Sequence, residues 1–435
     1  MGVFELSALL IVVMLGALAL GLWIAFSLSL VALVALLSKP AIPAAQVLAT
    51  SFWSASTSWD LTALPMFIWM GEILYRTRLS EDMFKGLAPW MGRLPGGLLH
   101  TNIAGCTIFA AVSGSSAATL TTVGKMTIPE LRKRRYPERL TIGTLAGAAT
   151  LGLMIPPSLT LIVYGVAINE SITKLFIAGI IPGLVLAFLF MCYVVIVSKL
   201  SKDYNPAVEP EMPFVEKVKR SRFLVPVLLL ITLVIGSMYV GIATATEAAA
   251  IGVLGSLALA AGQRSLTVGN FFESLMGATR TSAMIALILA GAAFLSLSMG
   301  FTGLPRALAE WIASIDLSRF QLLMVLLVFY IILGCFLDGI SVVVLTIAIV
   351  EPMIRQVGID IIWFGIFIVV VVEMAQITPP IGFNLFVLQG MTGHPMSYIA
   401  RAAFPMFLIM VAMVFILIIF PELATWLPEN MRQAR

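Results

Sequence analysis

Residues 141–165, TIGTLAGAATLGLMIPPSLTLIVYG, decide the fold of this chain. The stretch is almost wholly apolar and long enough to cross a bilayer, but Pro156 and Pro157 interrupt its centre. Because proline lacks a backbone N–H and clashes with the preceding turn, a continuous helix should break just before Pro156. Opened backbone at membrane depth survives only inside protein or beside a polar cavity. The stretch therefore predicts a broken span at a working site.

The composition is that of an integral membrane protein. Hydrophobic residues make up 60% of the 435 positions and charged residues 11%, well below the roughly 25% of soluble domains. Apolar runs of about 20 residues recur, whereas a transmembrane barrel would show short alternating segments. The net charge of +4 gathers in loops, so it indicates topology and not nucleic-acid binding. We therefore predict an all-α polytopic membrane protein.

The first half of the chain contains a segment with the pattern of a re-entrant hairpin. Residues 95–131 place two apolar arms around a polar tip at 113–116, Ser-Gly-Ser-Ser. Basic residues lie at both ends, and because basic loops face the cytoplasm, the segment should enter the membrane and return. The basic residues are Arg76, Arg78, Lys85 and Arg93 before the hairpin and Arg132, Lys133, Arg134, Arg135 and Arg139 after it.

The second half repeats this pattern. Residues 320–351 again place apolar arms around a polar tip, at 338–341, and Pro379 and Pro380 break the long apolar stretch 361–388. The loop after the second hairpin contains only Arg355, so the positive-inside rule puts equivalent loops on opposite sides. This predicts an inverted repeat with two re-entrant hairpins and two discontinuous helices, typical of secondary transporters. Four proline pairs are each 223 positions apart: Pro129 and Pro352, Pro156 and Pro379, Pro157 and Pro380, Pro182 and Pro405.

The remaining segments read as spans, connections and interfacial helices. Apolar residues at helical spacing in residues 80–93 predict an amphipathic helix in the membrane interface, and residues 304–315 resemble it. The second span is followed by a polar, Ser/Thr-rich connection that reaches Asp60. Spans are predicted at residues 6–20, 23–37, 61–74, 175–197, 223–240, 246–261 and 282–299.

The chain contains four long motifs, at residues 151–165, 174–184, 239–255 and 377–390. They resemble the large membrane subunit of the tripartite ATP-independent periplasmic (TRAP) transporters, and the resemblance covers nearly the whole chain. It implies a sodium-coupled importer of organic acids that works by an elevator motion in the bacterial inner membrane. It also implies two partners, a periplasmic binding protein that delivers the substrate and a small four-helix membrane subunit, which we expect to be a separate polypeptide. The motifs are LGLMIPPSLTLIVYG (151–165), KLFIAGIIPGL (174–184), YVGIATATEAAAIGVLG (239–255) and ITPPIGFNLFVLQG (377–390).

The resemblance divides the chain into a scaffold and a transport domain. The scaffold would comprise residues 1–94, with the interfacial arm helix, and residues 175–303, with a cytoplasmic linker at 199–222. The transport domain would comprise residues 95–174 and 320–398, each with one hairpin and one broken helix. A second arm helix is expected at 304–319, and a C-terminal span and tail at 399–435.

Two sodium sites are expected where each hairpin tip meets a broken helix. Sodium prefers oxygen ligands, and a broken helix supplies free carbonyls without burying a second full charge. The alternative is that these glycines and serines bind no ion and only allow the helices to pack closely. The first site would use Ser113, Ser116, Gly152, Ile155 and Pro157; the second would use Gly339, Ala375, Thr378 and Pro380, with Ile381 as a neighbour.

An organic acid would sit between the hairpin tips and the breaks, where half-helix N-termini present free N–H groups. Ser115, Ser158 and Asn384 are the candidate donors. Asp338 is a further candidate, with an ion site or a helix cap as alternatives. The resemblance leaves the substrate open among a dicarboxylate, a sialic acid and another sugar acid, and we expect no organic cofactor.

Three charged residues in apolar stretches have two readings each. Lys125 either contacts the substrate or extends to the cytoplasmic interface, and the second is favoured. Glu247 either serves function or caps the next helix, and the cap is favoured. Glu373 either carries a proton or makes a hydrogen bond across helices.

Two other functions fit parts of the sequence. An intramembrane hydrolase would need a serine with a histidine base, and the histidines are His100 and His394. No partner for Ser115 is indicated, so we predict no catalytic residues. The second alternative is a standalone sodium- or proton-coupled elevator carrier or antiporter that uses no binding protein.

Overall fold

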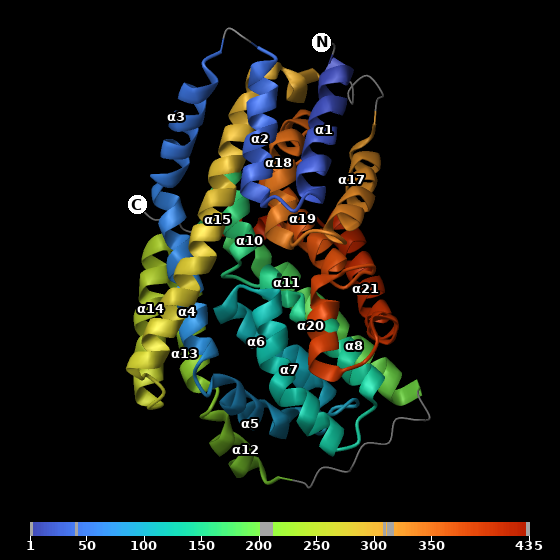
Figure 1. The fold of residues 1–435 in the computed structure, drawn as a ribbon. Coiled ribbons are helices and arrows are strands. Elements are labelled where there is room, and N and C mark those ends of the chain that lie inside the picture. The colour runs from blue at the N-terminus through green and yellow to red at the C-terminus, as the bar shows by residue number, and fades with distance from the viewer. Residues whose placement is uncertain (1–2, 40–41, 201–211, 308–309, 311–316, 432–435) are drawn as a thin grey trace.

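The computed structural model describes residues 3–39, 42–200, 212–307, 310 and 317–431, and within these ranges all regular secondary structure is helical (Figure 1). The predicted all-α class is confirmed. By length and composition, six of the described helical segments can cross a membrane, or seven if the bent pair Phe214–Ser221 and Val225–Tyr239 is one span. The six are Glu138–Ile168, Ile172–Leu200, Ala245–Gly262, Val268–Thr302, Gly339–Gln356 and Met396–Ile419.

Each half of the chain contains a helical hairpin. The first consists of α6 (Leu99–Ser113) and α7 (Ser116–Lys133), and the second of α17 (Arg319–Gly334) and α18 (Gly339–Gln356). The first hairpin lies in the lower part of Figure 1 and the second in the upper part. These opposite positions agree with an inverted repeat.

Each half also contains the predicted broken helix. In the first half α8 (Glu138–Ala149) and the short α9 (Leu151–Met154) precede the prolines, and α10 (Leu159–Ile168) follows them. In the second half α19 (Ile361–Gln376) and α20 (Phe383–Thr392) flank Pro379 and Pro380. The two halves interlock, because α10 packs against α18 and α7 packs against α20.

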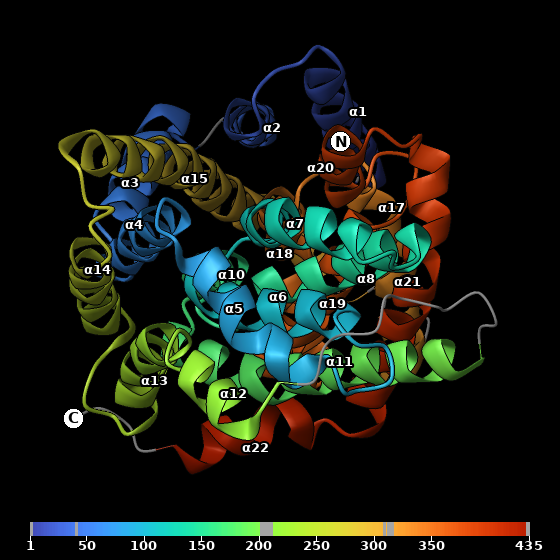
Figure 2. The ribbon, with the colours of Figure 1, turned by 90° about the horizontal axis from the view of Figure 1, so that it is seen from below.

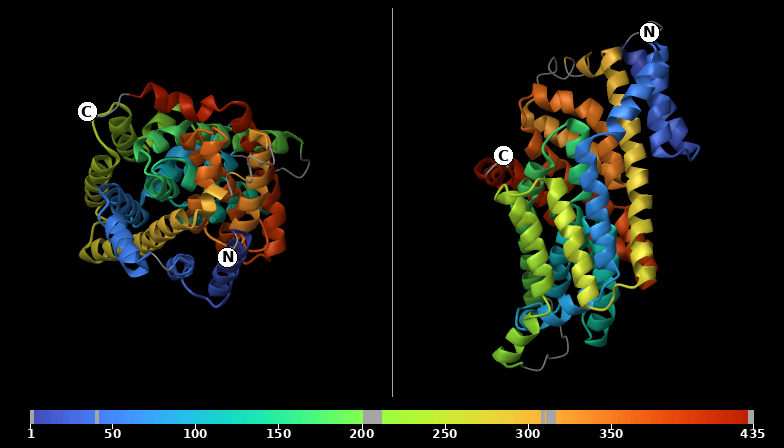
Figure 3. Two further views of the ribbon diagram at one scale, coloured as in Figure 1. Left: turned by 90° about the horizontal axis from the view of Figure 1, so that it is seen from above. Right: turned by 90° about the vertical axis from the view of Figure 1, so that its left-hand side faces the viewer.

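The repeat extends beyond the hairpins into the helices along one side of the molecule (Figures 2 and 3). A shift of 223 positions takes α2 (Ile24–Leu37) onto α14 (Ala245–Gly262) and α4 (Ala63–Tyr75) onto the second part of α15 (Val268–Thr302). The packing follows the same relation, since α4 lies against α14 and α15 lies against α2. Likewise α1 (Val3–Ala19) corresponds to α13 (Val225–Tyr239).

The connection predicted between residues 38 and 60 is wrong for most of its length, because α3 (Ala44–Ser56) is a helix. Its polar side chains bond to the helix backbone: Thr50 Oγ1 donates to Gln46 O over 2.9 Å and Ser51 Oγ to Val47 O over 2.7 Å. The hydroxyls are therefore satisfied locally. A 3₁₀ turn, η1 (Trp59–Thr62), joins α3 to α4, whereas α15 covers the equivalent positions without a break.

The predicted amphipathic helix is confirmed as α5 (Leu79–Met91), which packs against both arms of the first hairpin. Leu79, Met83 and Leu87 are buried and Lys85 is exposed. Within the linker, α12 (Phe214–Ser221) lies beside α5, while residues 201–211 are outside the described residues. So are residues 308–309 and 311–316 of the expected second arm helix.

Three further helices complete the fold. The long α11 (Ile172–Leu200) follows the first broken helix, and α21 (Met396–Ile419) follows the second. The last helix, α22 (Glu422–Asn430), packs along α11. The repeat relation holds here too, since α8 packs on α21 and α19 packs on α11. The first broken helix and α19 therefore lie largely in the interior, between the two halves.

Candidate functional site

The tip of the first hairpin touches the first helix break backbone to backbone. Gly114 ends α6 with a φ of +60°, and its carbonyl accepts a hydrogen bond of 3.3 Å from the N–H of Leu159. A Cβ on Gly114 would lie 2.6 Å from Pro157 O, and one on Gly152 would lie 2.7 Å from Ser115 O. Only glycine allows this approach.

All five residues of the predicted first sodium site lie at this contact, and all are buried. Ser113 and Ser116 flank the tip, and the Ser113 hydroxyl shares a hydrogen bond of 2.8 Å with Thr119 Oγ1. Ile155 and Pro157 lie in the non-helical segment between α9 and α10. The tip serines and the opened backbone therefore lie at one buried contact, and their role as sodium ligands stays a prediction.

Ser116 also joins the first half of the repeat to the second. Its Oγ lies within hydrogen-bond distance of Ala149 O (3.0 Å) and Glu373 Oε2 (3.2 Å), and it accepts a hydrogen bond of 2.7 Å from Asn384 Nδ2. Asn384, predicted as a substrate donor, thus donates to the hairpin tip. Of the two readings of Glu373, the hydrogen bond across helices is present.

The sequence reasoning did not include Ala149 in the site. The sequence predicted the break just before Pro156, so it did not indicate that α8 already ends at Ala149 and leaves this carbonyl without an intrahelical partner.

The second hairpin lies against the second break in a corresponding way. A Cβ on Gly334 would lie 2.5 Å from the Ala375 Cβ, and Cys335 Sγ lies 3.4 Å from Pro379 O. The Thr378 hydroxyl donates to Met374 O over 2.7 Å, which leaves its oxygen lone pairs available. The predicted second-site residues Gly339, Ala375, Thr378, Pro380 and Ile381 are thus brought to one region.

The two breaks differ in exposure. Residues 151–160 are buried throughout, whereas residues 379–381 are exposed, with Ile381 at 40%. The second break therefore reaches the surface of this chain, and the first is enclosed within it.

Three of the predicted substrate residues cap helices. The side chains of Ser115, Ser158 and Asp338 accept hydrogen bonds of 3.4, 3.3 and 3.3 Å from the N–H three positions on, and so begin α7, α10 and α18. The Ser158 hydroxyl also donates to Leu153 O, across the break. Ser115 and Asp338 are 223 positions apart and have the same role in the two halves. Of the roles considered for Asp338, the helix cap is the one present in the structure.

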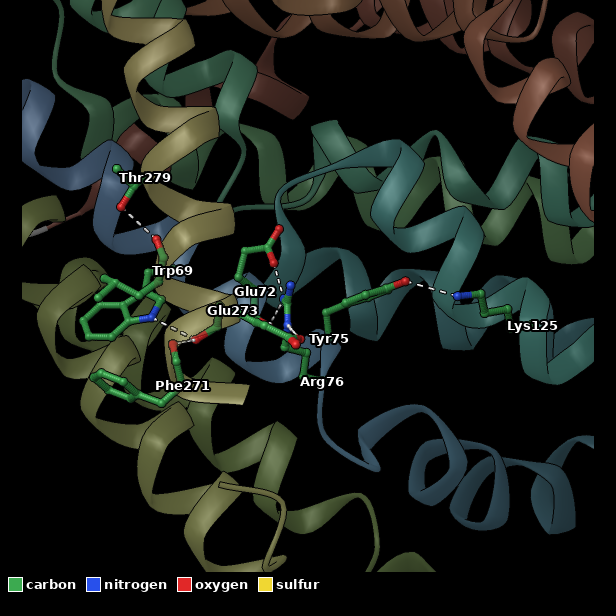
Figure 4. Close-up of polar contacts among 10 residues, drawn as sticks. Trp69, Glu72, Tyr75, Arg76, Lys125, Phe271, Glu273 and Thr279 are labelled. Atoms are coloured by element: carbon green, nitrogen blue, oxygen red, sulfur yellow. Dashed lines mark hydrogen bonds and ion pairs between the residues drawn. The ribbon is translucent and has the colours of Figure 1, made fainter. Parts of the chain in front are cut away.

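The structure gives Lys125 a partner within the chain and decides between the two readings for Glu247. Lys125 is exposed on α7, and its Nζ donates to Tyr75 Oη on α4 over 3.2 Å, away from the serine tip (Figure 4). Glu247 forms a capping box with Thr244, whose backbone N–H donates to Glu247 Oε2 over 2.8 Å. The predicted cap is confirmed.

The hydrolase alternative has no geometric support from its histidines. His100 begins α6 and Ser113 ends it, which at about 1.5 Å per residue separates them by roughly 20 Å. His100 Nε2 lies 2.9 Å from Pro95 O, and His394 Nε2 lies 3.1 Å from Glu138 Oε1. Among the described residues, no group of three or more His, Cys, Asp or Glu side chains could hold a metal ion.

Two repeated units that each pair a hairpin with a broken helix define a secondary transporter. Residues 11–423 match a family model described as "Tripartite ATP-independent periplasmic transporter, DctM component". The chain belongs to this family, as its large membrane permease. The family predicted from the four sequence motifs is thereby confirmed.

Known relatives agree with this assignment. The chain is 32% identical to the C4-dicarboxylate TRAP transporter large permease protein DctM of Pseudomonas aeruginosa, over 88% of this chain and 89% of the relative. It is 28% identical to the sialic acid TRAP transporter large permease protein SiaM of Vibrio cholerae, over 95% and 96%. The crystal structure of the Alcanivorax borkumensis YdaH transporter has a similar fold, with a TM-score of 0.58 at 12% identity over 88% and 87% of the two chains.

Proposed function

We propose that this permease imports a small organic acid together with sodium ions. The observation that carries the proposal is the buried contact between the first hairpin tip and the first break, where Gly114 approaches Pro157 O and Gly152 approaches Ser115 O. Hydroxyl and carbonyl oxygens suit a hard cation, and the opened helices leave carbonyls free to bind it. The second tip and break offer Thr378 and the neighbouring carbonyls in the same arrangement.

The substrate belongs between the two tips, and we propose a dicarboxylate, a sialic acid or a sugar acid. Support comes from the relatives, which are named for C4-dicarboxylates and for sialic acid. Within the chain, the helices that begin at Ser115, Ser158 and Asp338 have N-termini near the tips and breaks, and helix N-termini favour carboxylates.

Transport by an elevator motion is the mechanism we propose. The interlocked pairs α10 with α18 and α7 with α20 unite residues 95–174 with residues 320–398. The helices of residues 1–94 and 175–303 would form the scaffold, and residues 399–435 the C-terminal span and tail. Such a division lets the first group move past the second as one body.

The partners would be those of a tripartite system in a bacterial inner membrane. A periplasmic binding protein would deliver the substrate, and a small four-helix membrane subunit would lie beside the scaffold. Both proposals rest on family membership, because the family description names a tripartite periplasmic transporter.

Reconstitution in proteoliposomes tests the proposal. The chain and its small subunit are supplied with labelled substrate, with or without the binding protein, under an inward sodium gradient or an equal potassium gradient. We expect uptake of unmodified substrate only when both the binding protein and the sodium gradient are present. Uptake without the binding protein would favour the standalone carrier, and uptake driven by a pH gradient alone would favour proton coupling.

A further inference from the structure

The buried cluster around Ser116 contains more hydrogen-bond acceptors than hydrogens to share among them. The single Ser116 hydroxyl hydrogen faces two acceptors, Ala149 O and Glu373 Oε2. The other carboxylate oxygen, Glu373 Oε1, and the amide oxygen, Asn384 Oδ1, are buried without any hydrogen-bond partner. Turning the Asn384 amide over would place a third acceptor on the same hydroxyl, so the excess does not depend on its orientation.

The cluster also lacks a positive charge. Glu373 is 1% exposed and Asn384 is fully buried. In the described part of the chain no ion pair involves Glu373, although removing a carboxylate from water without a counter-charge costs several kcal/mol. The excess of acceptor oxygens around one unpaired carboxylate is relieved either by a bound cation or by a proton on Glu373, and only a bound cation makes the protein respond to sodium.

We propose that Glu373, Asn384 and Ser116, with the Ala149 carbonyl, hold a sodium ion between the two halves of the repeat. One carboxylate balances one positive charge, and the remaining ligands are neutral oxygens, which suits a hard monovalent cation. Among the described residues, no group of three or more acidic, histidine or cysteine side chains could hold a divalent or transition metal. This inference rests on the proposed sodium coupling. It shares Ser116 with the first predicted tip site and adds three ligands that lie outside both sites: Glu373, Asn384 and the Ala149 carbonyl.

The position of this ion would give it a structural consequence. Ser116 begins the second arm of the first hairpin, Glu373 lies on α19 before the second break, and Asn384 lies on α20 after it. An ion held by all three would fasten the first hairpin to both sides of the second break. Its release would loosen the contact between the halves.

Sodium-dependent thermal stability of the purified full-length chain tests the site without substrate. Sodium chloride replaces potassium chloride at constant ionic strength, and the Tm is followed. We expect the wild-type Tm to rise with sodium, and the half-effective concentration to rise about tenfold in Glu373→Gln and Asn384→Leu, as for other lost ligand interactions. Glu351→Gln removes a carboxylate that pairs with Arg355 instead, and should respond as wild type.

The outcomes separate this site from the proposed function. If Glu373→Gln keeps the wild-type response while Ser116→Ala has lost it, the Glu373 site is wrong and the first tip site stands. If sodium drives uptake but leaves the wild-type Tm unchanged, the inference is likewise overturned. If sodium affects neither uptake nor the wild-type Tm, the proposed sodium coupling itself is wrong.

A charge-conserving variant covers the case in which Glu373→Gln does not fold. Glu373→Asp keeps the carboxylate, but its shorter side chain places the carboxylate further from the proposed ion. The ratio of the half-effective lithium concentration to the half-effective sodium concentration should therefore change. An unchanged ratio would show that this carboxylate does not bind the ion.

Discussion

Asn384 Nδ2 donates to Ser116 Oγ over 2.7 Å, and this buried bond ties the second broken helix to the tip of the first hairpin. The two residues are 268 positions apart in the chain. Because each lies beside a helix break, a change at one of them is transmitted to the other half of the repeat.

Ser116→Ala should raise the sodium concentration for half-maximal uptake about tenfold, because it removes a ligand oxygen and leaves the Asn384 amide without its acceptor. Uptake measured over a sodium series checks this. The matched control is Ser256→Ala, which removes a buried hydroxyl that bonds only within α14, to Val253 O. Equal sodium dependence in both variants would contradict the first site.

Thr378→Ala tests the second break. The variant removes the side-chain oxygen proposed for the second sodium site, so it should also shift the sodium dependence of uptake upward. Thr392→Ala is the control, because Thr392 makes the same kind of bond as Thr378, a hydroxyl donated to the carbonyl four residues back over 2.7 Å. Thr378→Ser should restore sodium dependence, and failure to do so would argue for a packing role.

Gly152→Ala should separate the first tip from the first break. The new Cβ would meet Ser115 O and Ser116 Cα at 2.7 Å, and overpacking of this kind costs about 1–3 kcal/mol. We expect a lower Tm and little sodium-driven uptake. Gly390→Ala, which has no atom within 4 Å, should gain about 0.5–1 kcal/mol of helix stability and keep uptake. Normal uptake by Gly152→Ala would show that the close approach is dispensable.

The contact between Lys125 and Tyr75 offers a test of the elevator proposal, because it joins the first hairpin to α4, a helix of the proposed scaffold (Figure 4). Cysteines at both positions, in a chain without Cys106, Cys192 and Cys335, should arrest uptake once joined by a short bifunctional thiol reagent. The long side chains of Lys125 and Tyr75 together bridge the distance between α7 and α4. A disulfide between cysteines at these two positions would therefore be too short.

The control for this cross-link lies within the scaffold. Trp69 Nε1 donates to Ser274 Oγ over 3.2 Å, and both residues belong to proposed scaffold helices. Joining cysteines at Trp69 and Ser274 should leave uptake intact. Uptake that continues with the Lys125–Tyr75 pair joined would mean that the assigned bodies do not move past each other.

Glu247→Gln removes the charge but keeps the capping box that begins α14, because glutamine also fits it, as Gln321 does at the start of α17. Thr244→Ala and Glu247→Ala each break the box. The loss of a cap costs about 1 kcal/mol, so each of these two variants should have a lower Tm with the sodium dependence of uptake unchanged. Denaturation and uptake measured on the same preparations check this. A changed sodium dependence in Glu247→Gln but not in Thr244→Ala would instead place this acid on the ion path.

Local chemistry made much of this fold predictable. Prolines have no N–H to continue a helix, so both breaks followed from Pro156 and Pro379, and the constant separation of 223 positions identified the repeat. The Glu247 cap followed from its place just after a turn. The helix α3 was missed because a run rich in serine and threonine resembles a connection, although its hydroxyls bond to the helix backbone.

Long-range side-chain contacts were beyond the reach of the sequence. Glu373 stood out as an acid in an apolar span, but its contact with Ser116 depends on how two distant helices pack. Asn384 was predicted as a substrate donor because the sequence does not show what its side chain contacts. Only the folded chain shows that its amide faces the hairpin tip. The partner of Lys125 on α4 was equally hidden.

The interlocking of α10 with α18 and of α7 with α20 makes the two halves mutually dependent. If the gene were divided between α11 and α12, either fragment expressed alone would expose faces that are normally covered by the other. Produced together, the fragments should reassemble into an active permease. The two repeats would then form an obligate pair, in which neither can be lost or replaced independently.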